Sequence, residues 1–148
     1  MADLFLVVRP ARSEDAPALE AIAAEAGLSF QAARDLDRPF VSVLVASAAD
    51  EVVGFLSIQH TALEAEILDL GVLAAYRRRG VGKRLLDRAL ALAQEHAARE
   101  LFLEVRRGNA AAVALYGASG LSQVGERKRY YRDGEDALLF RILLGSTA

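Results

Sequence analysis

The chain has 148 residues, of which 53% are hydrophobic and 26% are charged, the balance of a globular protein. This is the length of one domain, so residues 1–148 are expected to form a single domain that folds without metals or disulfides. The absence of cysteine excludes a disulfide framework, thiolate zinc sites and a cysteine nucleophile. The net charge of −2 argues against nucleic acid as a partner.

The chain carries no obvious membrane or export signal. No stretch approaches the roughly 18 consecutive apolar residues of a membrane-spanning helix, so no membrane partner is expected. The N-terminal apolar run is short, has no basic region before it, and ends at Arg9-Pro10. It is too short for the core of a signal peptide, and we expect a cytoplasmic protein.

The first half of the chain is predicted to contain a strand, a helix and a hairpin. Residues 4–8 form a short β-type run. Apolar residues then recur at helical spacing over 13–27, between a capping serine and a glycine stop. A weaker helical segment covers 29–36. Two further β-type runs, 40–46 and 52–58, flank a short turn and indicate a hairpin.

The second half is predicted to alternate strands and helices. Its elements are a strand at 64–73, a helix at 82–96, a strand at 101–105, a helix at 109–118, and closing strands at 123–131 and 137–144. The closing strands flank Asp133-Gly134, a turn dipeptide. The whole order, β-α-α-β-β-β-α-β-α-β-β, predicts an α/β domain (α+β by some schemes) with a mixed sheet flanked by helices.

The most informative segment follows the predicted strand at 64–73. It reads Arg77-Arg78-Arg79-Gly80-Val81-Gly82-Lys83 and opens a helix. Glycines allow backbone amides to approach a ligand, and a helix N-terminus adds unpaired donors and partial positive charge. The four basic side chains add full charges. The segment therefore predicts a phosphate or diphosphate site, with an ordinary basic turn at a helix start as the alternative.

Two other phosphate-binding motifs do not fit this segment. A P-loop requires glycine at position 77 and serine or threonine at position 84, and both positions hold arginine. A dinucleotide-binding fingerprint requires glycine at position 85, which is leucine. The ligand is therefore not predicted to be bound through either motif.

Several residues together resemble a known family. Arg77-x-x-Gly80-x-Gly82 resembles the motif with which GNAT acetyltransferases bind the pyrophosphate of acetyl-CoA. The pattern L-E-V-R-x-x-N-x-x-A-x-x-L-Y, present here from Leu103 to Tyr116, resembles the RimI-type bacterial ribosomal-protein alanine N-terminal acetyltransferases. So does the Tyr130-Tyr131 pair, which is followed by Asp133-Gly134-Glu135-Asp136-Ala137. The resemblance covers residues 64–140.

The resemblance implies the GNAT fold and its co-substrate. We expect a mixed, mostly antiparallel central sheet of six to seven strands, flanked by about four helices. Acetyl-CoA would be the co-substrate, and no metal is expected. Two histidines without a partner motif support that expectation.

The sequence departs from the RimI-type pattern in two places. Members of that subfamily often carry Pro-Trp-Ser near residues 28–30, whereas this chain has Leu28-Ser29-Phe30 and no tryptophan. The usual Y-E-K-L-G-F segment is replaced by Tyr116-Gly117-Ala118-Ser119-Gly120-Leu121. The first departure lies on the acceptor side, so the identity of the acceptor stays open.

The resemblance also implies roles for residues that bind the co-substrate. Main-chain groups of Leu70, Gly71 and Val72 would polarise the thioester carbonyl. Asn109 and Tyr116 lie about two helical turns apart, so one cofactor arm could meet Asn109 along the pantetheine and Tyr116 near the sulfur. A glycine inside a strand also indicates a bulge or a close backbone approach. The alternatives are a packing glycine at Gly71 and a plain helix cap at Asn109.

The catalytic candidates are Glu104 as general base and Tyr116 as general acid. Glu104 lies between apolar neighbours in a predicted strand, and the alternative is an ion pair with Arg106 or Arg107. The alternative for Tyr116 is a core aromatic. Three acidic residues of the preceding strand are reserve bases: Glu64, Glu66 and Asp69. Tyr130 and Tyr131 are expected to hydrogen-bond the backbone of an incoming N-terminus.

These features predict acetyl transfer from acetyl-CoA to an amine by direct attack in a ternary complex, since no cysteine is present to carry the acyl group. The expected acceptor is the N-terminal α-amino group of a protein, such as a ribosomal protein. A lysine or a small-molecule amine is the alternative acceptor. A non-catalytic acetyl-CoA-binding sensor is an alternative of another class. A monomer or a weak homodimer is expected.

Overall fold

The computed structural model describes residues 5–145. Its helices and strands follow one another in the predicted order. They are β1 (Leu6–Pro10), α1 (Ala16–Ala26), α2 (Ala32–Asp35), β2 (Val41–Ala48), β3 (Glu51–His60), β4 (Glu64–Val72), α3 (Val81–Glu95), β5 (Glu100–Arg106), α4 (Ala110–Ala118), β6 (Ser122–Arg127) and β7 (Ala137–Leu143). Short 3-10 turns precede α1 and follow β4. No helix among the described residues is both long and apolar enough to cross a membrane.

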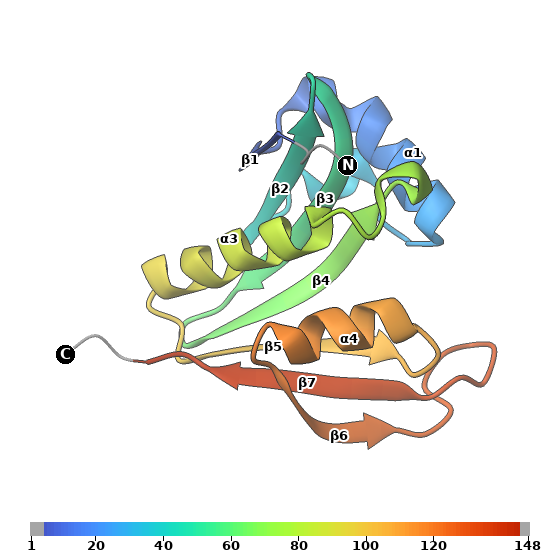
Figure 1. Ribbon diagram of the computed structural model, residues 1–148. Helices are drawn as coiled ribbons and strands as arrows, with labels where there is room; N and C mark the ends of the chain where they lie inside the picture. The colour runs from blue at the N-terminus through green and yellow to red at the C-terminus, as the bar shows by residue number, and fades with distance from the viewer. Residues whose placement is uncertain (1–4, 146–148) are drawn as a thin grey trace.

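The strands form one seven-stranded sheet in the order β1-β2-β3-β4-β5-β7-β6. Every neighbouring pair is antiparallel except β4 and β5, which are parallel. Pairing between β4 and β5 begins at Glu64 with Glu100 and ends at Ile67 with Leu103. Beyond that point the two strands diverge, and the sheet opens into two wings (Figure 1). The N-terminal wing consists of β1 to β4, and the C-terminal wing consists of β5, β7 and β6. The predicted mixed, mostly antiparallel sheet is confirmed.

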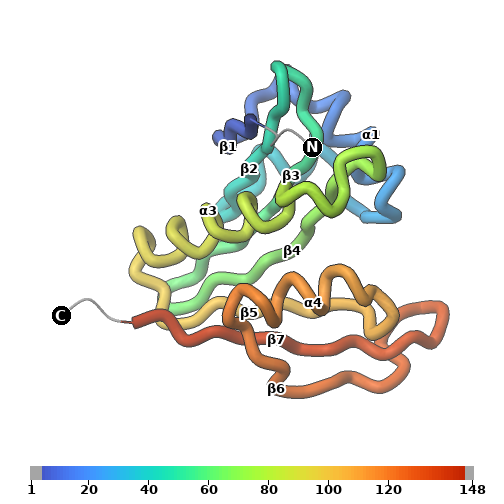
Figure 2. Tube along the Cα trace, in the orientation of Figure 1, coloured from blue at the N-terminus to red at the C-terminus, as the bar shows by residue number. Residues whose placement is uncertain are grey.

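Helices cover the sheet on both faces, and each face has its own apolar core. In β2, Leu44 and Ala46 pack toward α3, whereas Val43 and Val45 pack toward α1. This two-residue alternation is what a strand between two helical layers requires. Figure 2 shows α3 along the β2–β4 wing and α4 along the β5–β7 wing. The two wings therefore have separate helices on the same face of the sheet.

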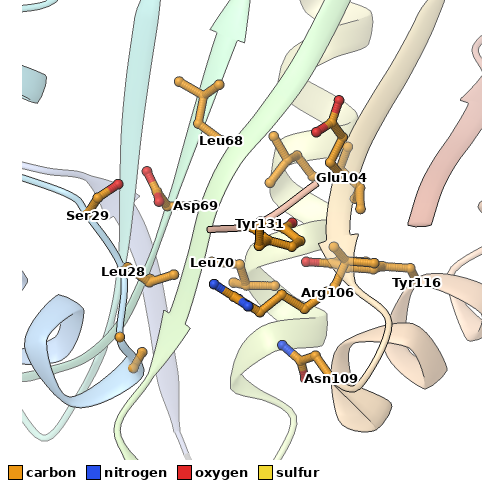
Figure 3. Close-up of a pocket in the computed structure, with 15 residues that line it drawn as sticks. Leu28, Ser29, Leu68, Asp69, Leu70, Glu104, Arg106, Asn109, Tyr116 and Tyr131 are labelled. Carbon is orange, nitrogen blue, oxygen red and sulfur yellow. The ribbon is translucent and has the colours of Figure 1, made fainter. Parts of the chain in front are cut away.

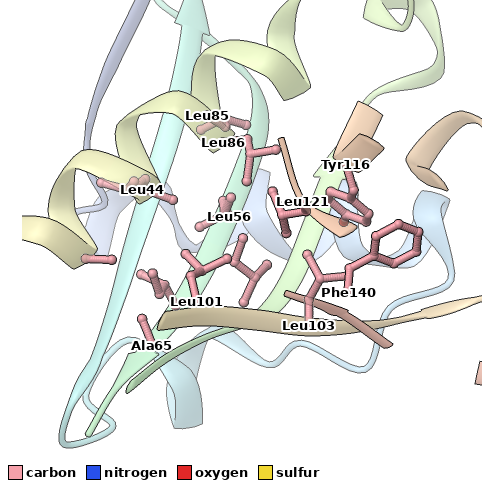
Figure 4. Packing of buried hydrophobic residues seen from close by; sticks show 14 of the residues in the cluster. Leu44, Leu56, Ala65, Leu85, Leu86, Leu101, Leu103, Tyr116, Leu121 and Phe140 are labelled. Atoms are coloured by element: carbon pink, nitrogen blue, oxygen red, sulfur yellow. The ribbon is translucent and has the colours of Figure 1, made fainter. Parts of the chain in front are cut away.

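The core beneath α3 and α4 is continuous across the opening between the wings. Leu85 and Leu86 of α3 are fully buried in it on the N-terminal wing, as Figure 4 shows. On the C-terminal wing, Tyr116 of α4 packs with Phe140 of β7. Gly54 allows α3 to approach β3 closely, since a Cβ atom there would lie 2.8 Å from Val81 Cγ1. This contact fixes the N-terminus of α3, and with it the predicted phosphate loop, against the sheet.

The last hairpin differs from the prediction. The predicted strand at 123–131 ends at Arg127 in β6. Arg129 has a left-handed backbone (φ 51°), and its amide donates to Asp136 Oδ1 at 2.9 Å. A strand cannot continue through that conformation. Tyr130 and Tyr131 therefore lie on the connection between β6 and β7, not on a strand.

The first strand also differs. β1 begins at Leu6 and extends through Pro10, two residues further than predicted, because Arg9 and Pro10 pair with Val45 and Leu44. Proline is acceptable there because β1 is an edge strand with one unpaired side. Leu4, the predicted first residue, lies outside the described residues.

Candidate active site

The opening between β4 and β5 holds a cavity of about 400 Å³. Its walls come from the end of α1 and the loop after it, from β4 and β5, from α4, and from the β6–β7 connection. Figure 3 shows Asp69 and Leu70 of β4 on one side, with Glu104, Asn109 and Tyr116 on the other. The sequence placed these residues on separate elements, and the divergence of β4 from β5 gives them a common space.

A β-bulge in β4 shapes the near wall of this cavity. Ser57 pairs with Asp69, but its neighbour Ile58 pairs with Ile67, so Leu68 is an extra residue. A bulge changes which side chains face each side of a sheet. Asp69 is thereby opposite Ser57, whose hydroxyl donates to Asp69 Oδ2 at 2.9 Å.

The backbone at 70–72 is paired only on its β3 side, where Leu70, Gly71 and Val72 face Leu56, Phe55 and Gly54. Leu70 lines the cavity. A Cβ atom on Gly71 would lie about as close as packing permits to side chains of the second core, 3.1 Å from both Ile22 and Leu28. Gly71 is therefore a packing glycine, while the other edge of the same strand segment faces the opening.

The predicted phosphate loop has the geometry of an anion site. Gly80 is the N-cap of α3, in a left-handed conformation (φ 86°), and it supplies no side chain to cap the first-turn amides. No residue from Arg77 to Arg79 forms an ion pair within residues 5–145. Lys83 is the exception among the loop's basic side chains, with its Nζ 2.6 Å from Asp87 Oδ1. First-turn amides without a side-chain cap, and arginines that form no ion pair among the described residues, favour an anionic ligand at this helix start.

Glu104 lies at the mouth of the cavity with 20% of its side chain exposed, and its Oε1 accepts from Arg127 Nε at 3.1 Å. The alternative pairing with Arg106 or Arg107 is wrong. Arg106 instead pairs with Asp133 and Glu135. Arg107 pairs with Glu126 and Asp136. The arginines that follow Glu104 in sequence hold the β6–β7 connection, and the partner of Glu104 comes from a strand two places away in the sheet.

Tyr116 and Asn109 reach the cavity from α4. Tyr116 is 5% exposed, and burial raises its pKa to about 12, so the phenol is protonated at any physiological pH. The Oδ1 of Asn109 caps α4 by accepting from Ala112 N at 3.2 Å. Asn109 is thus a helix cap and a cavity residue at once, and Tyr116 is both a core aromatic and a cavity residue.

The two tyrosines of the β6–β7 connection are not equivalent. Tyr131 lines the cavity, with the Arg106 guanidinium 4.1 Å from its ring centroid. Burial raises the pKa of Tyr131. Tyr130 is 51% exposed, and a hydrogen bond to Glu104 raises its pKa. One tyrosine therefore faces the cavity and the other faces Glu104.

The reserve bases differ in their surroundings. Burial raises the pKa of Glu66, and the nearby charge of Glu104 raises it further. Burial also raises the pKa of Asp69, although the hydrogen bond from Ser57 opposes this. Asp69 lines the main cavity, whereas Glu64 and Glu66 line a smaller hollow of about 30 Å³. Glu64 is exposed.

Other parts of the chain add to this picture. The α1–α2 loop, including Leu28 and Ser29, lines the cavity, and its role there could be predicted only through the family resemblance. The L-E-V-R pattern contains Arg106, but the sequence indicates neither that Arg106 lines the cavity nor that Arg127 contacts Glu104. His60 and His96 stack with ring centroids 3.9 Å apart, and no cluster of three or more metal-ligating side chains exists in the described part of the chain.

Residues 7–121 match the model of the acetyltransferase (GNAT) family. The chain belongs to this family. It is a GNAT-family N-acetyltransferase, and the predicted fold is confirmed. The crystal structure of the ribosomal-protein-S18-alanine N-acetyltransferase from Escherichia coli superposes with a TM-score of 0.84 at 25% identity, covering 97% of each chain.

Curated relatives agree with this assignment. The chain is 38% identical over 113 residues to N-alpha-acetyltransferase RimI of Mycobacterium tuberculosis, covering 73% of this chain and 70% of that protein. It is 41% identical over 113 residues to an uncharacterized protein of Mycobacterium leprae, of which it spans 31%. The resemblance to RimI-type enzymes seen in the sequence is confirmed.

Proposed function

We propose that this GNAT enzyme, acting as one domain, transfers the acetyl group of acetyl-CoA to the N-terminal α-amino group of a protein. The observation that carries the proposal is the cavity between β4 and β5, which is lined by both Glu104 and Tyr116 and by Leu70 of the strand that leads to the α3 phosphate loop. The names of relatives support the acceptor class, since the Salmonella typhimurium protein that is 32% identical over 99 residues is a ribosomal-protein-bS18-alanine N-acetyltransferase.

The residues present fit acetyl-CoA. The diphosphate would lie at the N-terminus of α3, on the amides after Gly80 and beside the arginines at 77–79. The pantetheine arm would run through the opening between β4 and β5, past Asn109. Because β4 has no strand partner on that edge beyond Ile67, its backbone groups are available to a ligand.

The proposed reaction is direct attack of the amine on the thioester carbonyl. A new C–N bond forms, the C–S bond breaks, the amine proton passes to Glu104, and Tyr116 gives a proton to the departing thiolate. A neutral phenol is required for that last step, and the high pKa of Tyr116 ensures it. Backbone amides of the 70–72 segment would stabilise the negative charge that develops on the carbonyl oxygen.

The acceptor would enter on the side of Glu104. There the cavity is bounded by Leu28 and Ser29 of the α1–α2 loop and by Tyr131 of the β6–β7 connection. Tyr131 would hydrogen-bond the backbone of the acceptor. The site has room for a small first residue such as alanine or serine, since the same cavity must also hold the acetyl group and the pantetheine end.

The experiment that tests this proposal is incubation with acetyl-CoA and a panel of amines, analysed by mass spectrometry. The panel contains peptides that begin with Ala, Ser, Gly or Met, N-blocked peptides with an internal lysine, and polyamines. Acetylation located at the α-amino group of the Ala and Ser peptides is the expected result. Acetylation only of lysine or of polyamines would assign another acceptor, and no acetylation of any amine would contradict the proposal.

A further inference from the structure

Arg127 reaches Glu104 across the middle strand of the C-terminal wing. Arg127 is the last residue of β6, Glu104 lies in β5, and β7 runs between them. The residue of β7 that pairs with Arg127 is Ala137, and the same alanine pairs with Arg106 on the other side. Ala137 is fully buried and carries only a methyl group. The Nε of Arg127 lies 3.1 Å from Glu104 Oε1.

Tyr130 lies beside the same carboxylate. The Glu104 carboxylate raises the pKa of the Tyr130 hydroxyl, and the Arg127 guanidinium carbon lies 5.7 Å from the Tyr130 ring centroid. The edge-on contact with Tyr131, at 5.1 Å between ring centroids, connects this group to the cavity wall. Arg127 and Tyr130 therefore form a clamp on Glu104, which we call the Glu104 clamp.

The Glu104 clamp lies next to a second carboxylate, that of Glu66. Glu66 faces Glu104 from β4, and their mutual repulsion contributes to the raised pKa of Glu66. The pKa of Tyr131 is raised by burial and, next, by the charge of Glu104. Within residues 5–145, Arg127 is the cation that forms an ion pair with Glu104.

The clamp leaves Glu104 able to accept a proton. A carboxylate offers about four acceptor positions on its two oxygens. The Arg127 contact uses one position on Oε1. The remaining positions are free for the acceptor's amine or for a water molecule that carries its proton.

We propose that Arg127 and Tyr130 are positioning residues, which hold the Glu104 carboxylate in the orientation that faces the acceptor amine. The inference rests on the proposed function, because it assumes that Glu104 is the base. In this inference Tyr130 helps to position Glu104, and Tyr131 alone of the two tyrosines contacts the acceptor. Through Arg127, the edge strand β6 would help to orient the proposed base.

The test is a double-mutant cycle between Arg127 and Glu104. Removing a hydrogen bond to a charged group corresponds to a reduction of about 10- to 100-fold. Arg127→Gln should therefore lower kcat by that factor and leave the KM for acetyl-CoA unchanged. Arg127→Lys should recover part of the loss. In the Glu104→Gln background, Arg127→Gln should cause little further loss, since the group it positions is gone. Tyr130→Phe should show the same pattern at smaller size.

Arg129→Gln is the matched control. Arg129 is also exposed and follows β6 by two residues, but its described hydrogen bond is made by its backbone, so kcat should not change. Thermal unfolding and acetyl-CoA affinity show whether each variant folds. Every variant is assayed with whichever amine the wild-type protein acetylates, so failure of the N-terminal assignment leaves this test intact. Equal losses from Arg127→Gln in both backgrounds, or a loss equal to that of Arg129→Gln, would overturn the inference.

Discussion

Ile67 of β4 and Leu103 of β5 are the last paired residues of the two parallel strands, and Glu104 follows Leu103 directly. The proposed base is thus the first residue of β5 beyond the end of pairing. Its β4 counterpart in a continued ladder would be Leu68, where the bulge interrupts the strand. The place where the sheet opens and the place where the proposed chemistry occurs are therefore the same, and the predictions below follow from that arrangement.

Replacing the proposed base should affect turnover and not co-substrate binding. Glu104→Gln is expected to lower kcat by about 10²–10⁴, the usual contribution of a general base. Acetyl-CoA affinity should stay near that of the wild type, because the phosphate loop lies on the other wing. Steady-state kinetics and calorimetry measure both quantities. Full activity of this variant would make Glu66 or Asp69 the next candidate.

Tyr116→Phe should lower kcat with little effect on acetyl-CoA affinity, because the ring stays and only the proton donor is lost. The pKa of about 12 also makes a prediction for the wild type. The phenol stays protonated up to about pH 11, so Tyr116 should produce no basic limb in the pH profile below that value. A basic limb near pH 9 that disappears in Tyr116→Phe would contradict this.

The phosphate loop is tested at Gly82. A Cβ atom there would lie 3.1 Å from Leu115 Cδ2 of α4, so a branched side chain would press α3 and α4 apart. Gly82→Val is expected to weaken acetyl-CoA binding strongly, as measured by calorimetry. Gly117→Ala is the control, since a Cβ atom at that position meets no neighbour within 4 Å. Unchanged affinity in Gly82→Val would remove the loop from the binding site.

Much of the fold could be predicted from the sequence because the signals are local. The helix over α3 follows from the spacing of Leu85, Leu86 and Ala89, and the paired strands β2 and β3 follow from their apolar runs. The end of β6 could not be predicted, because the run from Arg127 to Tyr131 favours a strand until Asp136 bonds the Arg129 amide. That bond joins residues whose contact depends on the turn between them.

The residues of the candidate site could be predicted from the sequence where they form contiguous motifs, and not where their contacts depend on strand pairing. The phosphate loop and the Glu104-to-Tyr116 segment were found in the sequence. The partner of Glu104 was not, since Arg127 reaches it through the order in which β5, β7 and β6 pair. The bulge at Leu68 likewise depends on the register of β3, which no local pattern specifies.

A stability prediction concerns Asp15, a buried carboxylate remote from the cavity. Its two oxygens accept from Arg9 Nη1 and Nη2 at 2.8 and 2.9 Å, and one also accepts from the Arg12 amide at 2.7 Å. The hydrogen bonds from Arg9, followed by that from the Arg12 amide, hold the pKa of Asp15 below its usual value. Asp15→Asn should lower the free energy of unfolding at neutral pH by about 1–3 kcal/mol, measured by urea unfolding.

The pH dependence of this effect has a definite sign. Because the pKa of Asp15 is lower in the folded state, its stabilisation is present above the unfolded value near 3.8 and is lost as pH falls through the folded value. The difference between Asp15→Asn and the wild type should therefore shrink below about pH 4. Glu14→Gln, an exposed neighbour, should change stability by less than about 0.5 kcal/mol. A constant difference from pH 3 to pH 7 would contradict the assignment.

The choice of acceptor has a physical basis in the protonation of amines. An α-amino group with a pKa of about 7.7–8.0 is neutral for about a seventh of the time at pH 7, against about 0.04% for lysine. A lysine enzyme must recover that difference of roughly 350-fold by desolvation or a stronger base. Two carboxylates line the cavity, Asp69 and Glu104, and the proposed base Glu104 is held in an ion pair, which suits the more easily deprotonated amine.

A competition assay measures the preference between an α-amino group and a lysine as acceptor most directly. Two peptides of the same sequence, beginning with Ala or Ser, are mixed at equal concentration with acetyl-CoA and the protein. One has a free N-terminus and no lysine, and the other is blocked at its N-terminus and carries an internal lysine. Mass spectrometry follows both products over time. We predict that the free-N-terminus peptide is acetylated at its α-amino group much faster than the blocked peptide. Equal rates, or faster acetylation of the blocked peptide at lysine, would contradict N-terminal acetylation as the function of this enzyme.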